Sequence, residues 1–346
     1  MPTALDRLAF NAAQAARISW FFGQKILAAR VSRPVPAPEA LRGRPVPDRR
    51  RILADLQALI EQDWRNIEAG HYALPMDELG SPFAAMRRAV DFFADLSAVE
   101  RRRHGPPGAH LLSEVATSGY PPYYLQTFHF QTDGYLSGAS AARYDHQVEV
   151  LFGGGAAAMR RQALVPLKAA VAGRGAARLL DVACGTGQFL RQIKTNYPRL
   201  HVTGIDLSPH YLGVAHRELR SWSRVSLVHG AAEAMPFAPA QFDAVTCIYL
   251  FHELPPQVRR AVVGEIRRVL RPGGMLIFVD SLQTGDEPDY DAMLDYFPVA
   301  FHEPYYESYL REDLDRLWSP GFSLSARIPA YFSKVLAYRR DPEAAD

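Results

Sequence analysis

The sequence predicts an α/β fold: a mostly parallel sheet of seven strands with helices on both faces, an antiparallel hairpin at one edge, and a helical region before it. Three observations support this fold class. From residue 174 onward, short apolar runs alternate with segments of helical periodicity. Two further strand-like runs close the chain next to each other, as a hairpin would. The first 125 residues show helical periodicity interrupted only by proline-rich stretches.

The length of 346 residues exceeds that of a typical single domain. We expect a mainly helical cap or assembly region over 1–125 and an α/β domain over 126–346. Hydrophobic residues make up 48% of the chain and charged residues 22%, a balance typical of a folded globular protein. The formal net charge of +2 lacks the basic excess of a surface that follows nucleic acid. The composition therefore predicts no nucleic-acid partner.

The cysteines and the apolar N-terminal stretch bear on location. Cys184 and Cys247 are the only two cysteines, which suits a reducing compartment and argues against a disulfide framework. The stretch "ISWFFGQKILAARV" is interrupted by Lys25 and Arg30 and is too short to span a bilayer, so it predicts an amphipathic helix and no stable membrane insertion. With no cleavage site of the secretory type, we expect a cytoplasmic protein.

Two further helices are predicted in the N-terminal region. "DRRRILADLQALIEQDWRNIEAG" has helical spacing, with Asp48 as N-cap and Gly70 at its end. "SPFAAMRRAVDFFADLS" opens with Ser81 as N-cap and Pro82 at the first helical position. The following "RRRHGPPGAH" is expected to be a loop whose arginines are solvated. A substrate-binding cap and a homodimerisation arm are both natural uses of this region.

The α/β part has five buried strands, whose sequences are rich in β-branched and aliphatic residues. Helical segments such as "SPHYLGVAHRELRSW" and "PPQVRRAVVGEIRRVLR" lie between them. A sheet of this kind binds ligands in a crevice at the carboxyl ends of its strands. The five runs are "ARLLDVAC", "LHVTGID", "VSLVHG", "FDAVTCIYL" and "GMLIFVDS", and the closing hairpin is "LSARIPAYF" with "KVLAYRR".

The stretch "LLDVACGTGQFL" places a Gly-Thr-Gly turn directly after the first strand. A dinucleotide fingerprint needs a third glycine, and Leu190 occupies that position. Asp181 lies inside the strand, where a carboxylate is costly unless it is paired or hydrogen-bonded. Asp206 ends the second strand, where an acid can accept both hydroxyls of a ribose. These features favour a cofactor that contains adenosine but no pyrophosphate.

Five stretches in order, "LLDVACGTGQFL", "VTGIDLSPHYL", "GAAEAMPF", "FDAVTCIYLFHEL" and "LRPGGMLIFVDS", resemble the motif series of class I S-adenosylmethionine-dependent methyltransferases. The resemblance covers about residues 140–346 and is closest to the ubiquinone/menaquinone-biosynthesis-type branch, methyltransferase type 11. It implies a Rossmann-like sheet and S-adenosyl-L-methionine as the cofactor. It does not specify the substrate.

The resemblance also implies which residues hold the cofactor. Gly185 and Gly187 would let the backbone approach its methionine part, Asp181 would face the ammonium group, and Asp206 would hold the ribose hydroxyls. The family commonly has an adenine-binding acid where this chain has Ala231, so adenine would depend on the backbone near Ala232 or on Glu233. Tyr144 would cover the cofactor, or would be a core tyrosine. The complete set is Asp181, Ala183, Gly185, Gly187, Asp206, Leu207, Ala232, Glu233, Ile248, Tyr249 and Tyr144.

Methyl transfer from a sulfonium depends mainly on positioning, and a general base is needed only if the acceptor must lose a proton. The catalytic candidates are His252 and Glu253, just beyond the fourth strand, and His302 in the insertion of about 282–310. This family often builds its substrate cover in that insertion. The histidines lack close ligand spacing, so no metal is expected.

The segment 121–147 is dense in aromatic and polar residues, and we expect it to line the mouth of the active site or to form an interdomain packing seam. His129, Gln131 and Asp133 are its substrate-binding candidates, and Tyr305 and Tyr306 are those of the insertion, where a plain lid core is the alternative. The predicted activity is methyl transfer to oxygen or carbon of a small aromatic or lipid-like acceptor. The alternatives are a protein or nucleic-acid methyltransferase, a non-catalytic cofactor-binding assembly module and, more distantly, an NAD-dependent oxidoreductase.

Overall fold

The computed structural model describes residues 2–76, 80–105, 119–173 and 176–342. The chain forms two compact units. One, called here the helical unit, comprises Met1–Ala158 with Asp289–Glu303; the other, the sheet unit, comprises Met159–Pro288 with Pro304–Asp346. The helical unit thus includes residues 126–158, whereas the sequence-based division starts the second domain at residue 126. That division stays a prediction.

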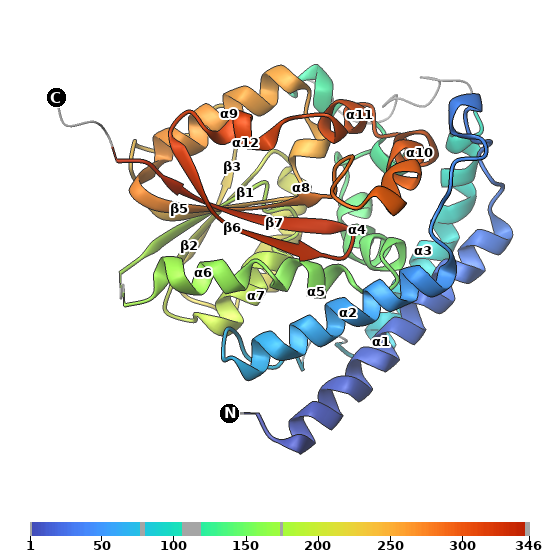
Figure 1. Cartoon of the computed structure of the whole chain (residues 1–346), viewed down its shortest axis with the longest axis horizontal. Coiled ribbons are helices and arrows are strands. Elements are labelled where there is room, and N and C mark those ends of the chain that lie inside the picture. The colour runs from blue at the N-terminus through green and yellow to red at the C-terminus, as the bar shows by residue number, and fades with distance from the viewer. Residues whose placement is uncertain (1, 77–79, 106–118, 174–175, 343–346) are drawn as a thin grey trace. The chain divides into compact units, whose positions relative to one another are not determined.

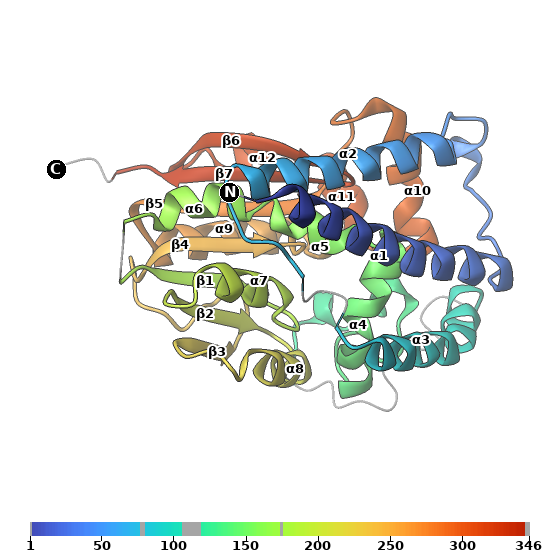
Figure 2. The same cartoon turned by 90° about the horizontal axis from the view of Figure 1, so that it is seen from below.

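The sheet unit contains the seven predicted strands. Their order is β3-β2-β1-β4-β5-β7-β6, and Figure 2 shows them side by side in this order. The first five strands pair in parallel, and the last two pair antiparallel at one edge, which confirms the predicted hairpin. The strands are β1 Arg178–Val182, β2 His201–Asp206, β3 Val225–His229, β4 Phe242–Ile248, β5 Leu270–Ser281, β6 Phe322–Ala330 and β7 Ser333–Arg340.

Helices cover both faces of this sheet, as predicted for parallel strands that are apolar on both sides. Figure 1 shows α6 (Leu164–Val171) and α7 (Gln188–Asn196) on one face, and α9 (Pro256–Val269) and α12 (Leu314–Trp318) on the other. Leu179, Leu180 and Val182 of the central strand β1 are consequently fully buried. The other helices of this unit are α8 Pro209–Leu219, α11 Tyr306–Leu310 and the single turn η4 Phe251–Glu253.

The helical unit is built from long helices with apolar faces. The buried side chains of α1 recur every three or four residues from Phe10 to Gln24, so one side of this helix packs on the protein, and that side combines two phenylalanines with polar residues such as Gln14 and Arg17. Asp48 caps α2 by accepting from the Arg51 N–H at 2.8 Å, also as predicted. The elements are α1 Ala4–Val31, η1 Glu39–Leu41, α2 Arg49–Glu68, α3 Pro82–Arg103, η2 Pro122–Tyr124, η3 Phe128–Phe130, α4 Gly138–Leu151 and α10 Asp291–Phe301; α5 Ala156–Arg161 and η5 Pro288–Tyr290 cross the division between the units.

The expected loop at "RRRHGPPGAH" is wrong at its start, because α3 continues through Arg103. Arginine has a high helix propensity, and cationic side chains are favoured in the last turn of a helix. Arg101 is exposed, as predicted, but Arg102 and Arg103 are not simply solvated. Arg102 donates to the Phe130 carbonyl at 2.7 Å and to Thr132 Oγ1 at 2.6 Å, and Arg103 pairs with Glu100 at 2.5 Å. Residues 106–110 of the expected loop lie outside the described residues.

None of the helices in the described ranges is both long enough and apolar enough to cross a membrane.

The two glycines after β1 have different steric surroundings, which gives a testable prediction. Both have positive φ, +54° at Gly185 and +80° at Gly187. A Cβ on Gly187 would lie 3.0 Å from Ala215 Cβ of α8, whereas a Cβ on Gly185 would meet nothing within 4 Å. We expect Gly187→Ala to lower the free energy of unfolding by about 2–4 kcal/mol and Gly185→Ala by about 1–2 kcal/mol, measured by urea denaturation. Equal losses would contradict the packing role of Gly187.

Candidate active site

The loop after β1 is the first part of the site. Ala183, Gly185 and Gly187 all have φ between +54° and +80°, so the chain turns sharply before α7 begins at Gln188. Left-handed backbone is strained for alanine and is common at functional sites. The Gly185 N–H points to the end of β2, where Asp206 Oδ2 accepts it at 2.8 Å. Beyond the role implied by the resemblance, Gly187 lets α7 pack closely on α8.

Asp206 connects this loop to the one that follows β2. Its Oδ2 accepts from Gly185 and its Oδ1 from the Ser208 N–H at 2.8 Å. Burial raises the pKa of this carboxyl, while the two backbone hydrogen bonds lower it. An ionised carboxylate can accept about four hydrogen bonds, so Asp206 keeps capacity for two ribose hydroxyls. The residue therefore fits the role that the resemblance implies.

Asp181 is the buried carboxyl of β1, only 2% exposed. Thr246 Oγ1 of β4 donates to its Oδ1 at 2.6 Å. Burial raises its pKa to about 7, the Asp206 charge adds to this rise, and the Thr246 hydrogen bond opposes it. A cationic group placed beside Asp181 would favour the ionised form. This chemistry fits the ammonium of the cofactor's methionine part.

The loop after β3 is held in place by α9. Its Gly230 N–H donates to the Asp206 carbonyl at 3.0 Å. Glu265 accepts from the Met235 N–H at 2.7 Å, and Arg268 donates to the Met235 carbonyl at 2.9 Å. Ala232 and Glu233, the predicted adenine contacts, lie half-buried in the loop between these anchors. The Leu207 carbonyl, on the neighbouring loop, accepts from His229 at 3.0 Å when Nε2 carries the proton.

The end of β4 supplies Ile248 and Tyr249. Ile248 is the last strand residue and is half-buried. Tyr249 has φ +56°, and its N–H donates to the Val279 carbonyl of β5 at 2.8 Å. Its hydroxyl forms a 2.8 Å hydrogen bond with Ser333 Oγ at the start of β7. The bend thus turns the chain out of the sheet immediately before His252.

His252 forms a buried dyad with Asp280 at the carboxyl end of β5. Its Nδ1 lies 2.6 Å from Asp280 Oδ1, and the two residues are 8% and 0% exposed. Asp280 also accepts from the N–H groups of Phe251 at 2.9 Å and Ser281 at 2.7 Å. A carboxylate that accepts at Nδ1 fixes the proton there, which leaves Nε2 as the basic nitrogen. Glu253 Oε1 lies 3.8 Å from Nε2.

Sequence reasoning named His252 and Glu253 but missed Asp280. A signal was present, because Asp280 is a carboxylate at the end of the buried run "LIFVDS", just as Asp181 is in "LLDV". What the sequence could not show is that the loop after β4 folds back onto the end of β5 and brings His252 to that carboxylate.

Three tyrosines surround the His252 ring. The ring centroids of Tyr306, Tyr309 and Tyr249 lie 5.8, 6.3 and 6.5 Å from that of His252. The Tyr309 hydroxyl donates to the Ser281 carbonyl at 2.7 Å, and that of Tyr306 contacts Ser281 Oγ. Of the two predicted substrate residues of the insertion, Tyr306 is therefore beside His252.

Buried Arg259 holds the loop that carries His252. It donates to the carbonyls of Phe251 and Tyr305, each at 2.8 Å, and pairs with Glu312 at 3.1 Å. Tyr305, the other predicted substrate residue, therefore contributes its main chain to this support. Arg259 joins η4 to α11 and so fixes both the dyad and its tyrosines.

The other predicted site residues belong to the helical unit. His302 lies 3.4 Å from Gln126 Oε1, and burial lowers its pKa. His129 lies 3.2 Å from Glu303, and Asp133 has φ +64°. Tyr144 and Gln131 line a cavity of that unit. Their roles toward the cofactor, the acceptor and catalysis stay predictions, as do those of the cofactor residues in the sheet unit.

Comparison with known proteins identifies the class of the sheet unit. A family model described as "Methyltransferase domain" matches residues 179–274. This match confirms a methyltransferase domain over these residues, in agreement with the predicted resemblance to the class I S-adenosylmethionine-dependent methyltransferases and with S-adenosyl-L-methionine as the cofactor. Among curated relatives, the demethylmenaquinone methyltransferase of Staphylococcus aureus (strain JH9) is 37% identical over 111 residues, which is 32% of this chain and 45% of that protein. The chain thus spans less than half the length of this relative.

Two solved structures also resemble part of the chain. The N-methyltransferase NodS from Bradyrhizobium japonicum, in complex with S-adenosyl-L-homocysteine, is 20% identical with a TM-score of 0.41, covering 53% of this chain and 87% of that one. A putative methyltransferase from Bacillus halodurans is 23% identical with a TM-score of 0.41, covering 51% and 98%.

The raised pKa of Asp181 predicts a pH dependence of stability. Its usual pKa is 3.8 and its pKa in the folded chain is about 7. Because the folded state binds this proton more tightly, the contribution is present below about pH 4 and is lost as the pH rises to about 7, to the extent of about 4 kcal/mol. Relative to Asp181→Asn, the wild type should lose stability over that range, measured by urea unfolding at successive pH values.

Thr246→Val supplies the matched test of this assignment. It removes the hydrogen bond that lowers the Asp181 pKa, so the loss of stability should extend to higher pH. Parallel pH profiles for the wild type and Asp181→Asn would show that another group is responsible.

Proposed function

We propose that the chain transfers the methyl group of S-adenosyl-L-methionine to oxygen or carbon of a small aromatic or lipid-like acceptor. The main support is that the His252–Asp280 dyad lies at the same edge of the sheet as Asp206 and Gly185. All of them follow carboxyl ends of parallel strands, which meet at one edge. A cofactor-binding edge that also holds an oriented base suits an acceptor that must lose a proton.

The cofactor, when bound, supplies an activated methyl group on a sulfonium. Asp206 would accept the ribose hydroxyls, Asp181 would neutralise the ammonium group, and the open side of Gly185 would let the backbone approach the methionine part. These contacts fix the orientation of the donor, and orientation supplies much of the rate of an in-line displacement.

His252 then acts as the general base. Its Nε2 would take the proton of the acceptor's hydroxyl or acidic C–H. The electron pair released would form the new bond to the methyl carbon while the sulfur–methyl bond breaks, and the electron pair of that bond would stay on the sulfur of the departing thioether, S-adenosylhomocysteine. The imidazolium that results is stabilised by Asp280, which already accepts at Nδ1. The tyrosines around His252 exclude water from this proton transfer and suit a flat acceptor.

The acceptor class is supported by the aromatic surroundings and by the matched relative, whose name gives demethylmenaquinone as its substrate. A protein or nucleic-acid acceptor and a non-catalytic module are the other hypotheses that the sequence left open. A cytoplasmic location, a homodimer and the absence of a nucleic-acid partner also stay predictions.

The cofactor assignment predicts ligand-dependent stabilisation. At one hundred times the dissociation constant, S-adenosylmethionine or S-adenosylhomocysteine should stabilise the wild type by about 2.7 kcal/mol. Asp206→Ala should remove this effect, because it removes the acceptors for the ribose hydroxyls. The control is Asp243→Ala, at the amino-terminal end of β4, which should keep the ligand-induced rise in melting temperature. A rise that survives Asp206→Ala would sink the ribose assignment.

The base assignment predicts a selective loss of rate. His252→Gln should lower kcat by about 10²–10⁴-fold with a panel of phenols, catechols and hydroxynaphthoquinones, while cofactor-induced stabilisation is kept. His201→Gln, at the opposite end of the sheet, is the matched control and should have normal kcat. If the rate is unchanged in His252→Gln, methyl transfer here needs no base at this position.

A further inference from the structure

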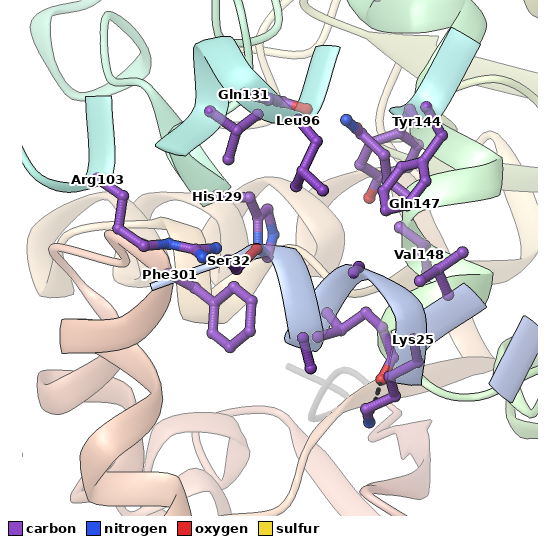
Figure 3. A pocket seen from close by; sticks show the side chains of 16 residues that line it. Lys25, Ser32, Leu96, Arg103, His129, Gln131, Tyr144, Gln147, Val148 and Phe301 are labelled. Carbon is purple, nitrogen blue, oxygen red and sulfur yellow. Dashed lines mark hydrogen bonds between the residues drawn. The ribbon is translucent and has the colours of Figure 1, made fainter. Parts of the chain in front are cut away.

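The helical unit contains a cavity of its own. Its volume is about 280 Å³, close to the lower end of small-molecule sites, and side chains of α1, α3, α4 and α10 line it (Figure 3). Most of its wall is apolar: Phe92, Leu96, Val99, Val148 and Phe301 all face it. Such a wall suits a hydrophobic or flat aromatic occupant.

One of the polar side chains in this wall is that of Gln131, which is only 2% exposed and lines the same cavity (Figure 3). Within the described part of the chain, neither Nε2 nor Oε1 of its amide has a hydrogen-bond partner. Buried amides are almost always paired, because an unpaired donor and acceptor lose their water without compensation. A donor and an acceptor side by side at a cavity wall point to a ligand that pairs with both.

The backbone around Gln131 is held in a strained conformation. His129, Phe130 and Asp133 all have positive φ, between +54° and +64°. The segment is fixed by Thr132, which accepts from Arg102 at 2.6 Å and donates to Asp95 at 2.7 Å. Strain of this kind persists only where the surroundings impose it, and it clusters at functional sites.

The charged neighbours of Gln131 favour a neutral ligand. Arg103 lies over the Phe301 ring at 5.7 Å and pairs with Glu100, and His129 lies 3.2 Å from Glu303. Lys25, at the other side of the cavity in Figure 3, donates to the Leu151 carbonyl at 2.8 Å. Arg103 and His129, which line the same cavity, therefore already lie against carboxylates, and an anionic ligand would have to compete with these carboxylates.

We propose that this cavity binds a flat, neutral aromatic molecule whose edge carries an N–H or O–H donor beside a carbonyl, as in a lactam or a hydroxy-carbonyl compound. Gln131 Nε2 donates to the carbonyl and Oε1 accepts from the donor, while the rings pack on the apolar wall. The inference does not rest on the proposed methyl transfer, because binding in this unit requires neither the cofactor nor the dyad.

Two probes test this pairing on the full chain. Quinolin-2(1H)-one has the N–H beside the carbonyl, and 1-methylquinolin-2-one has the same rings and carbonyl but no donor. Isothermal titration should show that the wild type binds the first at least tenfold more tightly. Equal affinities, or no binding of either compound, would overturn the proposal.

Variants of Gln131 locate the preference. Gln131→Met keeps the side-chain volume and should reduce the tenfold preference for quinolin-2(1H)-one to about onefold. If Gln131→Met does not fold, Gln131→Leu replaces it. Gln57→Met, exposed on α2, is the matched control and should keep the preference. A preference that survives Gln131→Met would also overturn the proposal.

A structural role for Gln131 makes a different prediction. If the amide only supported the fold, Gln131→Met would lower the melting temperature of the ligand-free chain. If the amide of Gln131 instead serves to bind a ligand, its removal should leave the melting temperature of the ligand-free chain equal or higher, because the amide is buried and unpaired. A marked decrease would count against the proposal.

Discussion

The geometry of the sheet edge proposed to bind the cofactor depends on the hydrogen bonds of Asp206. It accepts the N–H of Gly185 from the loop after β1 and that of Ser208 from the loop after β2, and its own carbonyl accepts the Gly230 N–H from the loop after β3. Three loops from three neighbouring strands are thus tied to one residue. Burial raises the pKa of Asp206, whereas the hydrogen bonds from Gly185 and Ser208 lower it. These hydrogen bonds therefore favour the charged carboxylate, and the charged carboxylate in turn holds the two loops in place.

The sheet has the same arrangement at a second strand, β5. Asp280 ends β5 as Asp206 ends β2, and it accepts the N–H of Phe251 in addition to holding His252. Buried Arg259 then fixes the Phe251 carbonyl from the opposite side. In both places a strand-end carboxylate accepts from the backbone of a loop. Asp280 also holds His252, and Asp206 is proposed to hold the ribose hydroxyls. The orientations of His252, the proposed base, and of Asp206, the proposed ribose-binding acid, are therefore set by rigid strands rather than by the loops alone.

The sequence predicted the parts of this arrangement that depend on local chemistry. Asp181, Asp206 and the Gly-Thr-Gly turn stand in short motifs that can be recognised without their partners, although Thr246, which donates to Asp181, lies 65 residues away on β4. Asp280 was missed because His252 reaches it only where the loop after β4 folds back onto the end of β5. The end of α3 was misplaced because the contacts of Arg102 with Phe130 and Thr132 are tertiary. No local pattern shows that residues 289–303 pack with the helical unit either.

Gln131 shows a further limit of prediction from sequence. The sequence could name it, as a polar residue among aromatics, but the informative property is a missing partner, and only the folded chain can show one. By contrast, buried Arg259 donates four hydrogen bonds, and Asp280 accepts from both a ring and the backbone. A buried amide with two unmet groups, on strained backbone and beside an apolar cavity, is therefore poorly explained by folding alone. Its conformation makes physical sense if a ligand supplies the missing donor and acceptor.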